Sequence, residues 1–227
     1  MAGILALVGG NEFRSDCVPM DRALLAALGG AARVAILPTA AAGQNPGKAA
    51  RNGVRYFSGL DAYAQAVMVV DANTANDPAM AGPLGDYNLI YLTGGSPPHL
   101  LESLRGSAVM EAIRDVLERG GMLVGSSAGA MAMGARCWGF GDGWLEGWGL
   151  APGVAVIPHH ASMAARWGAD KIRRDLADEV TLLGIDEATA AYGDGEGTWQ
   201  VVGPGQVTAY TASTVQSYGN GETFSTA

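Results

Sequence analysis

The chain is poor in charged residues and in cysteine, and both shortages limit the classes of function that it can have. Its 227 residues include 14 lysines and arginines against 22 aspartates and glutamates, which gives a formal net charge of −8. Nucleic acid and anionic membrane surfaces repel such a protein, so we expect neither as a partner. The two cysteines, Cys17 and Cys137, are too few for a disulfide framework and lack metal-ligand spacing. We therefore expect no metal site.

Long apolar runs are also missing. The N-terminal run Ile4–Val8 is far too short to span a bilayer, and no basic segment or cleavage site accompanies it. It is predicted to be a buried strand rather than a signal peptide. With two cysteines suited to a reducing compartment, the chain is predicted to be cytoplasmic. Hydrophobic residues make up 48% of it, enough for one large core, so we expect a single domain over residues 1–227.

Apolar runs alternate with helical patterns over the first two thirds of the chain, which predicts a mostly parallel sheet with helices on both faces. The expected strands are 4–8, 34–37, 66–70, 89–92 and 122–124, and the expected helices are 18–28, 46–57, 97–104 and 108–119. The predicted fold class is therefore α/β, a three-layer α/β/α sandwich.

The last third of the chain no longer alternates apolar runs with helical patterns. Residues 138–148 are rich in glycine and tryptophan and are predicted to form a long loop. A helix is expected at 163–177. Short strands are expected at 180–185, 189–192, 199–202, 207–210 and 214–217, which predicts an antiparallel extension at one sheet edge.

The most informative motif is Gly125-Ser126-Ser127-Ala128-Gly129. An apolar run precedes it and a small-residue segment follows it, which predicts a strand, a tight turn and a helix with Ser127 at the apex. This is the geometry of a nucleophile elbow, in which a side chain on either glycine would collide with the neighbouring strand or helix. Ser127 is the candidate nucleophile, and a turn of small residues packed under a helix is the alternative.

A nucleophilic serine needs a base, and the chain offers only His99, His159 and His160. His159 and His160 follow an apolar run, at the strand end where open α/β sheets build their sites. Adjacent side chains of an extended segment face opposite ways, so only one of the two can meet Ser127. A zinc site built from the three histidines lacks paired-ligand spacing.

The base needs an orienting carboxylate, and three positions compete for this role. Asp142 and Glu146 lie between the serine and the histidines, which is the chain order of α/β-hydrolases. Glu187 ends the apolar strand expected at 180–185, and this position at a strand end favours it.

An oxyanion hole needs backbone N–H groups. Ala128, directly after the nucleophile, is one candidate donor. The second lies in a strand-end loop, either Gly94-Gly95 or Gly9-Gly10. Gly94, Ser96, Ser126 and His160 are the candidate substrate-binding residues.

These features together resemble the peptidase E and cyanophycinase group of serine peptidases, the S51 family. The resemblance covers most of the chain and is carried in order by Val8-Gly9-Gly10-Asn11-Glu12, Leu92-Thr93-Gly94-Gly95, Gly125-Ser126-Ser127-Ala128-Gly129-Ala130, Leu150-Ala151-Pro152-Gly153 with Pro158-His159, and Gly184-Ile185-Asp186-Glu187.

The resemblance implies a fold similar to that of class I glutamine amidotransferases and a Ser-His-Glu triad in that chain order. Ser127 would be the nucleophile, His159 the base and Glu187 the orienting acid, with Gly95 and Ala128 supplying the oxyanion hole. It implies hydrolysis of a small peptide or amide without a cofactor, and it leaves a homodimer open. An esterase and a non-catalytic ligand-binding protein are the alternatives.

Two segments depart from the family. Cyanophycinases resemble Gly-Gly-Asp-Gln where this chain has Gly94-Gly95-Ser96-Pro97, and their arginine-rich segment after the histidine is here Ala161-Ser162-Met163-Ala164-Ala165-Arg166-Trp167. We therefore expect short substrates rather than cyanophycin, in a cleft walled by residues 138–148.

Overall fold

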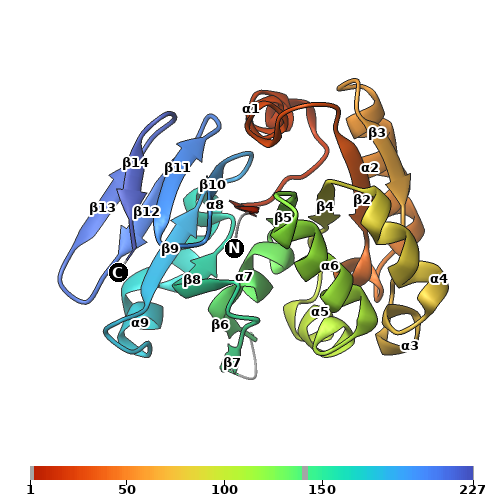
Figure 1. The fold of residues 1–227 in the computed structure, drawn as a ribbon. Coiled ribbons are helices and arrows are strands. Elements are labelled where there is room, and N and C mark those ends of the chain that lie inside the picture. The colour runs from red at the N-terminus through yellow and green to blue at the C-terminus, as the bar shows by residue number, and fades with distance from the viewer. Residues whose placement is uncertain (1–2, 140–142, 227) are drawn as a thin grey trace.

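The computed structural model of the protein describes residues 3–139 and 143–226. Within them the strands form two sheets, with helices packed around both (Figure 1). The larger sheet has eight strands in the order β14-β11-β10-β1-β5-β4-β2-β3. Their bounds are β1 Ile4–Val8, β2 Arg33–Leu37, β3 Tyr63–Ala66, β4 Leu89–Leu92, β5 Met122–Ser126, β10 Ala190–Gly193, β11 Thr198–Val202 and β14 Thr223–Ser225. Strands β1, β5, β4, β2 and β3 are parallel, and β10, β11 and β14 continue the sheet antiparallel beyond β1.

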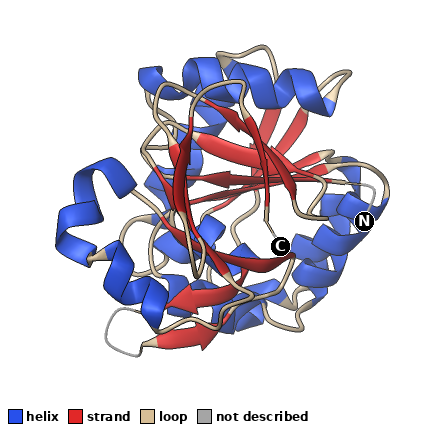
Figure 2. Ribbon diagram, turned by 90° about the vertical axis from the view of Figure 1, so that its left-hand side faces the viewer, coloured by secondary structure: helices blue, strands red, loops and turns tan. Residues whose placement is uncertain are grey.

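Helices cover both faces of this sheet, as Figure 2 shows. The helices are α1 Val18–Leu28, α2 Pro46–Ser58, α3 Ala72–Ala75, α4 Pro78–Ala81, α5 Pro97–Leu104, α6 Ala108–Glu118 and α7 Ala128–Met133, with 3-10 turns at Ser15–Cys17, Thr39–Ala41 and Gly82–Asp86.

Strand alternation explains this two-sided packing, since successive side chains point to opposite faces. Ala6 and Val8 of β1 join one buried cluster with Met20 of α1. Leu5 and Leu7 join another, which contains residues of α5, α6 and α7. Both faces of the central strands are therefore buried, which is why they read as continuous apolar runs.

The second sheet has six strands in the order β13-β12-β9-β8-β6-β7. Their bounds are β6 Gly134–Trp138, β7 Trp144–Glu146, β8 Ala151–Ile157, β9 Thr181–Ile185, β12 Val207–Tyr210 and β13 Val215–Tyr218, and α8 His160–Trp167 and α9 Ala169–Arg174 connect β8 to β9. Strands β6, β8 and β9 are parallel, and the others pair antiparallel.

Two backbone hydrogen bonds join the carboxyl-terminal ends of the two sheets. The N–H group of His159, after β8, donates to the carbonyl oxygen of Gly9 at 2.8 Å. The N–H group of Ala188, after β9, donates to the carbonyl oxygen of Gly10 at 3.1 Å. The segments that follow β8 and β9 therefore lie beside the end of β1.

The predicted α/β class is confirmed, and the helices expected at 18–28, 46–57, 97–104 and 108–119 form within one residue of those bounds. The antiparallel strands do not all extend one sheet edge as expected. β10 and β11 do so, together with the short β14, but β9 pairs in parallel with β8 and carries β12 and β13 into a second sheet.

Two other expectations were wrong in detail. The strand expected at 66–70 lies at Tyr63–Ala66. The apolar run predicted a strand because Val67 and Val69 are buried in the core, although they lie beyond the last residue of β3 that pairs with β2. Residues 138–148 are not one loop, because β7 pairs antiparallel with β6. In the described ranges no helix is long and apolar enough to cross a membrane.

Candidate active site

The elbow motif joins β5 to α7 as a sharp turn. A Cβ atom on Gly125 would lie 2.5 Å from the carbonyl carbon of Gly129, so only glycine lets the helix approach the strand this closely. Ser127, midway between these two glycines, has φ 49° and ψ −104°. This left-handed backbone is costly for a residue with a Cβ atom and is typical of strained functional turns. The turn therefore has the geometry of a nucleophile elbow, with a partly exposed serine at its apex.

His159 faces this serine from the end of β8. Its Nε2 atom lies 3.2 Å from Oγ of Ser127. The backbone of His159 is also left-handed, with φ 53°. The imidazole lies over Gly10, where a Cβ atom would be 2.2 Å from its Cε1 atom. A glycine in the turn after β1 is therefore what gives the imidazole its place beside the serine.

Glu187 follows β9 and lies on the other side of the imidazole. Its Oε1 atom is 3.3 Å from Nδ1 of His159. Burial raises the pKa of this carboxyl, but a hydrogen bond from Ser162 and the charge of a protonated His159 outweigh it, so the net pKa of Glu187 is lowered. The carboxylate therefore stays ionised next to the imidazole.

The competing carboxylates lie elsewhere or outside the described residues. The side chain of Glu146 is 81% exposed and its nearest basic partner is Arg105, at 3.8 Å. Asp142 lies outside the described residues. Of the described candidates, Glu187 is the one within hydrogen-bond reach of His159.

Ser162 is a site residue that the sequence analysis did not identify as functional. Its hydroxyl lies 2.5 Å from Oε1 of Glu187 and 3.1 Å from the carbonyl oxygen of His159. A serine three residues after the histidine, in the first turn of a helix, was the available signal. A hydroxyl at that position can reach back to the residue before the helix.

Glu12 is the second residue missed, although it closes the quoted Val8–Glu12 motif. Its Oε1 atom accepts a hydrogen bond from the N–H group of Gly94 at 2.8 Å. Its Oε2 atom accepts one from the Ser126 hydroxyl at 2.8 Å. Glu12 therefore ties the loop after β4 to the elbow.

These bonds limit which groups can form an oxyanion hole. The N–H group of Gly94 is occupied by Glu12, and that of Gly9 donates to the carbonyl oxygen of Thr189 at 3.0 Å. Ala128 is the first residue of α7, so its N–H group has no acceptor within the helix. Gly95 follows in the exposed part of the loop. Gly10, Gly95 and Ala128 thus remain the candidate donors.

Other predicted site residues have structural partners. Ser126 is fully buried against Glu12. Ser96 is exposed and caps α5 through the N–H group of His99. His99 contacts the carbonyl oxygen of Val70 at 2.8 Å. The structure therefore does not bring His99 to Ser127.

His160 turns away from its neighbour into the second sheet. Its Nε2 atom lies 2.8 Å from the hydroxyl of Tyr210, and its Nδ1 atom lies 3.6 Å from Asp186. Adjacent histidines thus face adjacent carboxylates, His159 with Glu187 and His160 with Asp186. The segment is not extended here, since His159 has a left-handed backbone and His160 is the first residue of α8, and this turn separates the two imidazoles.

Neither a metal-binding cluster nor a reactive thiol is present in the part of the chain that the structure describes. It holds no group of three or more histidine, cysteine or acidic side chains that could bind a metal ion. Cys17 and Cys137 are buried, and burial raises the pKa of each thiol to about 12. Both thiols are therefore protonated at neutral pH and are poor nucleophiles.

The adjoining carboxyl ends of the two sheets thus bring together a serine after β5 and a histidine and a glutamate after β8 and β9. Their relative positions are typical of serine hydrolases. Residues 4–201 match peptidase family S51. The chain therefore belongs to peptidase family S51, as the quoted motifs indicate.

Individual relatives agree with this family. Cyanophycinases from Trichormus variabilis and Nostoc sp. are each 35% identical over 131 residues, which cover 52% of this chain and 43% of the relative. The match thus spans less than half the length of these curated relatives.

Solved structures match over nearly the whole chain. The crystal structure of a peptidase from an acI-B1 actinobacterium has 29% sequence identity and a TM-score of 0.87, covering 98% of this chain and 96% of that one. A candidate peptidase E from Listeria monocytogenes has 15% identity and a TM-score of 0.62, covering 95% and 98%, and this likeness concerns the fold alone.

Proposed function

We propose that the protein is a serine peptidase or amidohydrolase that cleaves a short peptide or small amide through an acyl-enzyme. The observation that carries the proposal is the continuous chain of contacts from Ser127 Oγ to His159 Nε2, at 3.2 Å, and from His159 Nδ1 to Glu187 Oε1, at 3.3 Å. Membership of a peptidase family supports the reaction class.

In this mechanism His159 takes the proton of the Ser127 hydroxyl as its oxygen attacks the carbonyl carbon. The N–H groups of Gly95 and Ala128 bind the oxygen that becomes negative. His159 then donates the proton to the leaving amine, and Ser127 keeps the acyl group. A water molecule then attacks the acyl carbon while His159 takes its proton, and His159 returns that proton to Oγ of Ser127 as the acid is released.

Glu187 acts through the imidazole. Its ionised carboxylate accepts a hydrogen bond from the Nδ1–H group, which fixes the tautomer with a free Nε2 and stabilises the cation formed after proton transfer. The lowered pKa of Glu187 keeps this carboxylate charged over the pH range in which the imidazole works.

Covalent labelling tests the nucleophile directly. A fluorophosphonate should add once to the wild-type protein, and the added mass should map to Ser127. Ser127→Ala should abolish labelling and reduce hydrolysis by on the order of 10⁶, since the triad acts as a unit. Thermal unfolding should change little, because the lost hydroxyl packs at a partly exposed turn. Ser126→Ala is the matched control and should still be labelled. An unlabelled wild type, or a Ser127→Ala protein that keeps more than a few per cent of activity, contradicts the mechanism.

The class of bond that the protein cleaves can be tested with a panel of substrates. A panel of dipeptides, p-nitrophenyl esters, cyanophycin and denatured casein separates a peptidase from an esterase and short substrates from polymers. Dipeptide hydrolysis should exceed release from casein or cyanophycin. Ester hydrolysis without dipeptide hydrolysis would instead support the esterase alternative.

A further inference from the structure

The outermost strand of the larger sheet, β3, pairs with β2 on one side, and in the described residues no strand lies on its other side. The N–H groups of Tyr63 and Val67 donate to the carbonyl oxygens of Ala32 and Ile36, both at 3.0 Å. Backbone groups of successive strand residues point to alternate sides, so those of Ala64 and Ala66 point away from β2. Such an edge is a template for a further strand.

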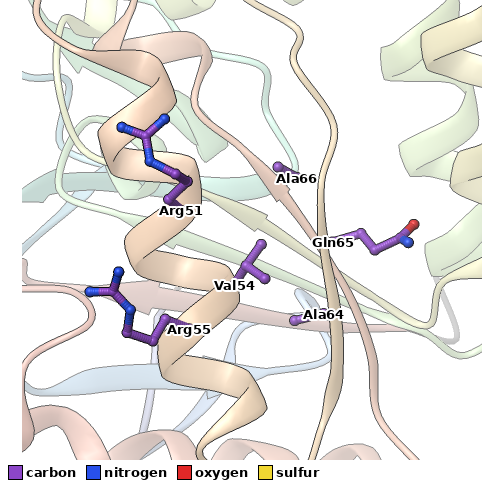
Figure 3. Close-up of a pocket in the computed structure, with 6 residues that line it drawn as sticks. All are labelled: Arg51, Val54, Arg55, Ala64, Gln65 and Ala66. Atoms are coloured by element: carbon purple, nitrogen blue, oxygen red, sulfur yellow. The ribbon is translucent and has the colours of Figure 1, made fainter.

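A groove of about 700 Å³ lies between α2 and this edge. It is lined by Arg51, Val54 and Arg55 of α2 and by Ala64, Gln65 and Ala66 of β3 (Figure 3). Figure 3 shows the side chains of Ala64 and Ala66 on the side of α2, whereas that of Gln65 points away from the helix. Because alanine side chains are short, the groove has room for side chains from a strand added beside β3.

The wall of the groove that α2 provides is positively charged. Arg51 and Arg55 are exposed, and within the part of the chain that the structure describes neither has an ion-pair partner. They lie one helical turn apart, about 6 Å along the helix axis. Side chains on one face of a strand recur about every 6.6–6.8 Å. Alternate residues of an added strand can therefore place one acidic side chain beside each arginine.

The opposite face of β3 is apolar. A cavity of about 240 Å³ lies there, and the residues that line it include Val67, Met68, Met80 and Pro83. Tyr63 and Met68, which are 47% and 37% exposed, are two of the three large hydrophobic residues that the described chain exposes. An added strand would therefore present apolar side chains to this face.

A second copy of this chain does not match the edge. Antiparallel pairing of β3 with its equivalent about a twofold axis would bring the two α2 helices to the same face. Arg51 and Arg55 would then face the same arginines of the other copy, and like charges opposite each other are destabilising.

We propose that this edge binds an extended segment of a partner protein, with alternating acidic and apolar residues, as an additional antiparallel strand. In an antiparallel pair, two residues that exchange hydrogen bonds carry their side chains on the same face. The residues opposite Ala64 and Ala66 are therefore the acidic ones, which lie over Arg51 and Arg55. The residues between them direct apolar side chains toward Met68 and the smaller cavity.

A fluorescein-labelled peptide of three Glu-Val repeats with blocked termini is the probe, and fluorescence anisotropy measures its binding to the Ser127→Ala protein, used to prevent cleavage. It should bind at least 10-fold more tightly than a Lys-Val peptide of equal length. Arg51→Met with Arg55→Met should weaken binding about 2- to 5-fold for each exposed ion pair lost. Arg22→Met with Arg114→Met removes the same charge from exposed positions of α1 and α6 and should leave binding unchanged.

Equal effects of the two pairs of substitutions contradict the assignment of the groove. A Glu-Val peptide that does not bind would leave the arginines only the protective role that charges have at sheet edges, and it would overturn the proposal.

Methylation of the peptide backbone separates strand addition from charge attraction alone. N-methylglutamate at each acidic position removes the N–H groups that would donate to the carbonyl oxygens of Ala64 and Ala66. N-methylvaline removes N–H groups that point away from β3. The first peptide should bind at least 10-fold more weakly than the second. Equal binding of the two, or weaker binding of the N-methylvaline peptide, overturns the antiparallel arrangement.

Hydrogen exchange and sedimentation test where the strand adds and what it belongs to. With the Glu-Val peptide bound, the N–H group of Ala66 should exchange more slowly, whereas β13, at the edge of the second sheet, should exchange as before. Protection of β13 alone would place the peptide elsewhere and contradict the proposal. Ala66→Pro removes the outward N–H group. A wild-type dimer that this substitution dissociates would make a second copy the occupant and would also overturn the proposal.

Discussion

The hydroxyl of Ser162 donates a 2.5 Å hydrogen bond to Oε1 of Glu187, the same oxygen atom that faces Nδ1 of His159 at 3.3 Å. The contact extends the proposed triad by one residue. It also ties the first turn of α8 to the segment after β9, which contains Glu187. The same hydroxyl lies 3.1 Å from the carbonyl oxygen of His159. Ser162 is therefore a positioning residue for the acid rather than a group that touches the substrate.

We predict that Ser162→Ala lowers kcat about 10-fold, because a hydrogen bond to a charged group is lost, while KM changes little. The pKa of Glu187 should rise once its strongest lowering contact is gone. Because the ionised carboxylate supports the imidazole, the acid-side loss of activity should then move to higher pH. A pH profile of kcat measures this shift.

The matched control for this prediction is Ser162→Thr, which keeps the hydroxyl and should retain the wild-type profile. An alanine variant with the same acid limb as the threonine variant would show that Ser162 has only a packing role.

We predict that the two adjacent histidines have different roles, His159 in catalysis and His160 in stability. His159→Ala should lose at least 10³ in kcat/KM, in line with loss of a triad base. His160 contacts Tyr210 and Asp186 instead, and its side chain is only 12% exposed. His160→Ala should therefore be less stable by about 1–3 kcal/mol, because its contacts with Tyr210 and Asp186 are lost, and should keep most of its activity.

His160→Gln, which can still reach the Tyr210 hydroxyl, should recover part of the lost stability in a thermal unfolding experiment. A nearly inactive His160 variant beside an active His159 variant would reverse the two assignments.

Much of the fold could be predicted because the central strands are buried on both faces and their helices are bounded by strong signals. Pro46 and Pro97 begin α2 and α5, and the residues before them, Asn45 and Ser96, cap the helices. Strand partners were harder to predict. The sequence of β9 does not tell whether the strand extends the first sheet or pairs with β8, because strand pairing depends on contacts between segments that are separated in the sequence.

The candidate site shows the same division between local and distant information. The elbow is local, so its glycines and Ser127 were visible in the sequence. The roles of Glu12 and Ser162 were not, since Glu12 meets Gly94 and Ser126 across 82 and 114 residues. Their partners are known only once the strand ends have been brought together.

A buried carboxyl group outside the proposed triad should give the protein a pH-dependent stability. Asp21 in α1 is 1% exposed, and its Oδ2 atom accepts a 2.8 Å hydrogen bond from the Tyr56 hydroxyl. Burial raises the pKa of Asp21 from 3.8 to about 7, although the Tyr56 bond opposes the change. The folded protein thus prefers the protonated acid, whereas the unfolded chain ionises it near its ordinary pKa.

The sign of the effect follows from this difference in proton binding. Between pH 4 and pH 7 the folded state holds a proton that the unfolded state has released, so the free energy of unfolding should fall as pH rises through this window. The total fall should be on the order of 2–4 kcal/mol, which corresponds to about 5–10 °C in the melting temperature. Above pH 7 both states are ionised and this contribution becomes constant.

We predict that Asp21→Asn removes this fall, because asparagine can accept the Tyr56 hydrogen bond without titrating. Melting temperatures at pH 5 and pH 8 should therefore differ less in the variant than in the wild type, whatever the absolute stability of the variant. Asp115→Asn, a change at an exposed position of α6, is the matched control and should keep the wild-type difference. If Asp21→Asn and Asp115→Asn leave the same difference between pH 5 and pH 8 as the wild type, Asp21 is not the group that makes stability depend on pH.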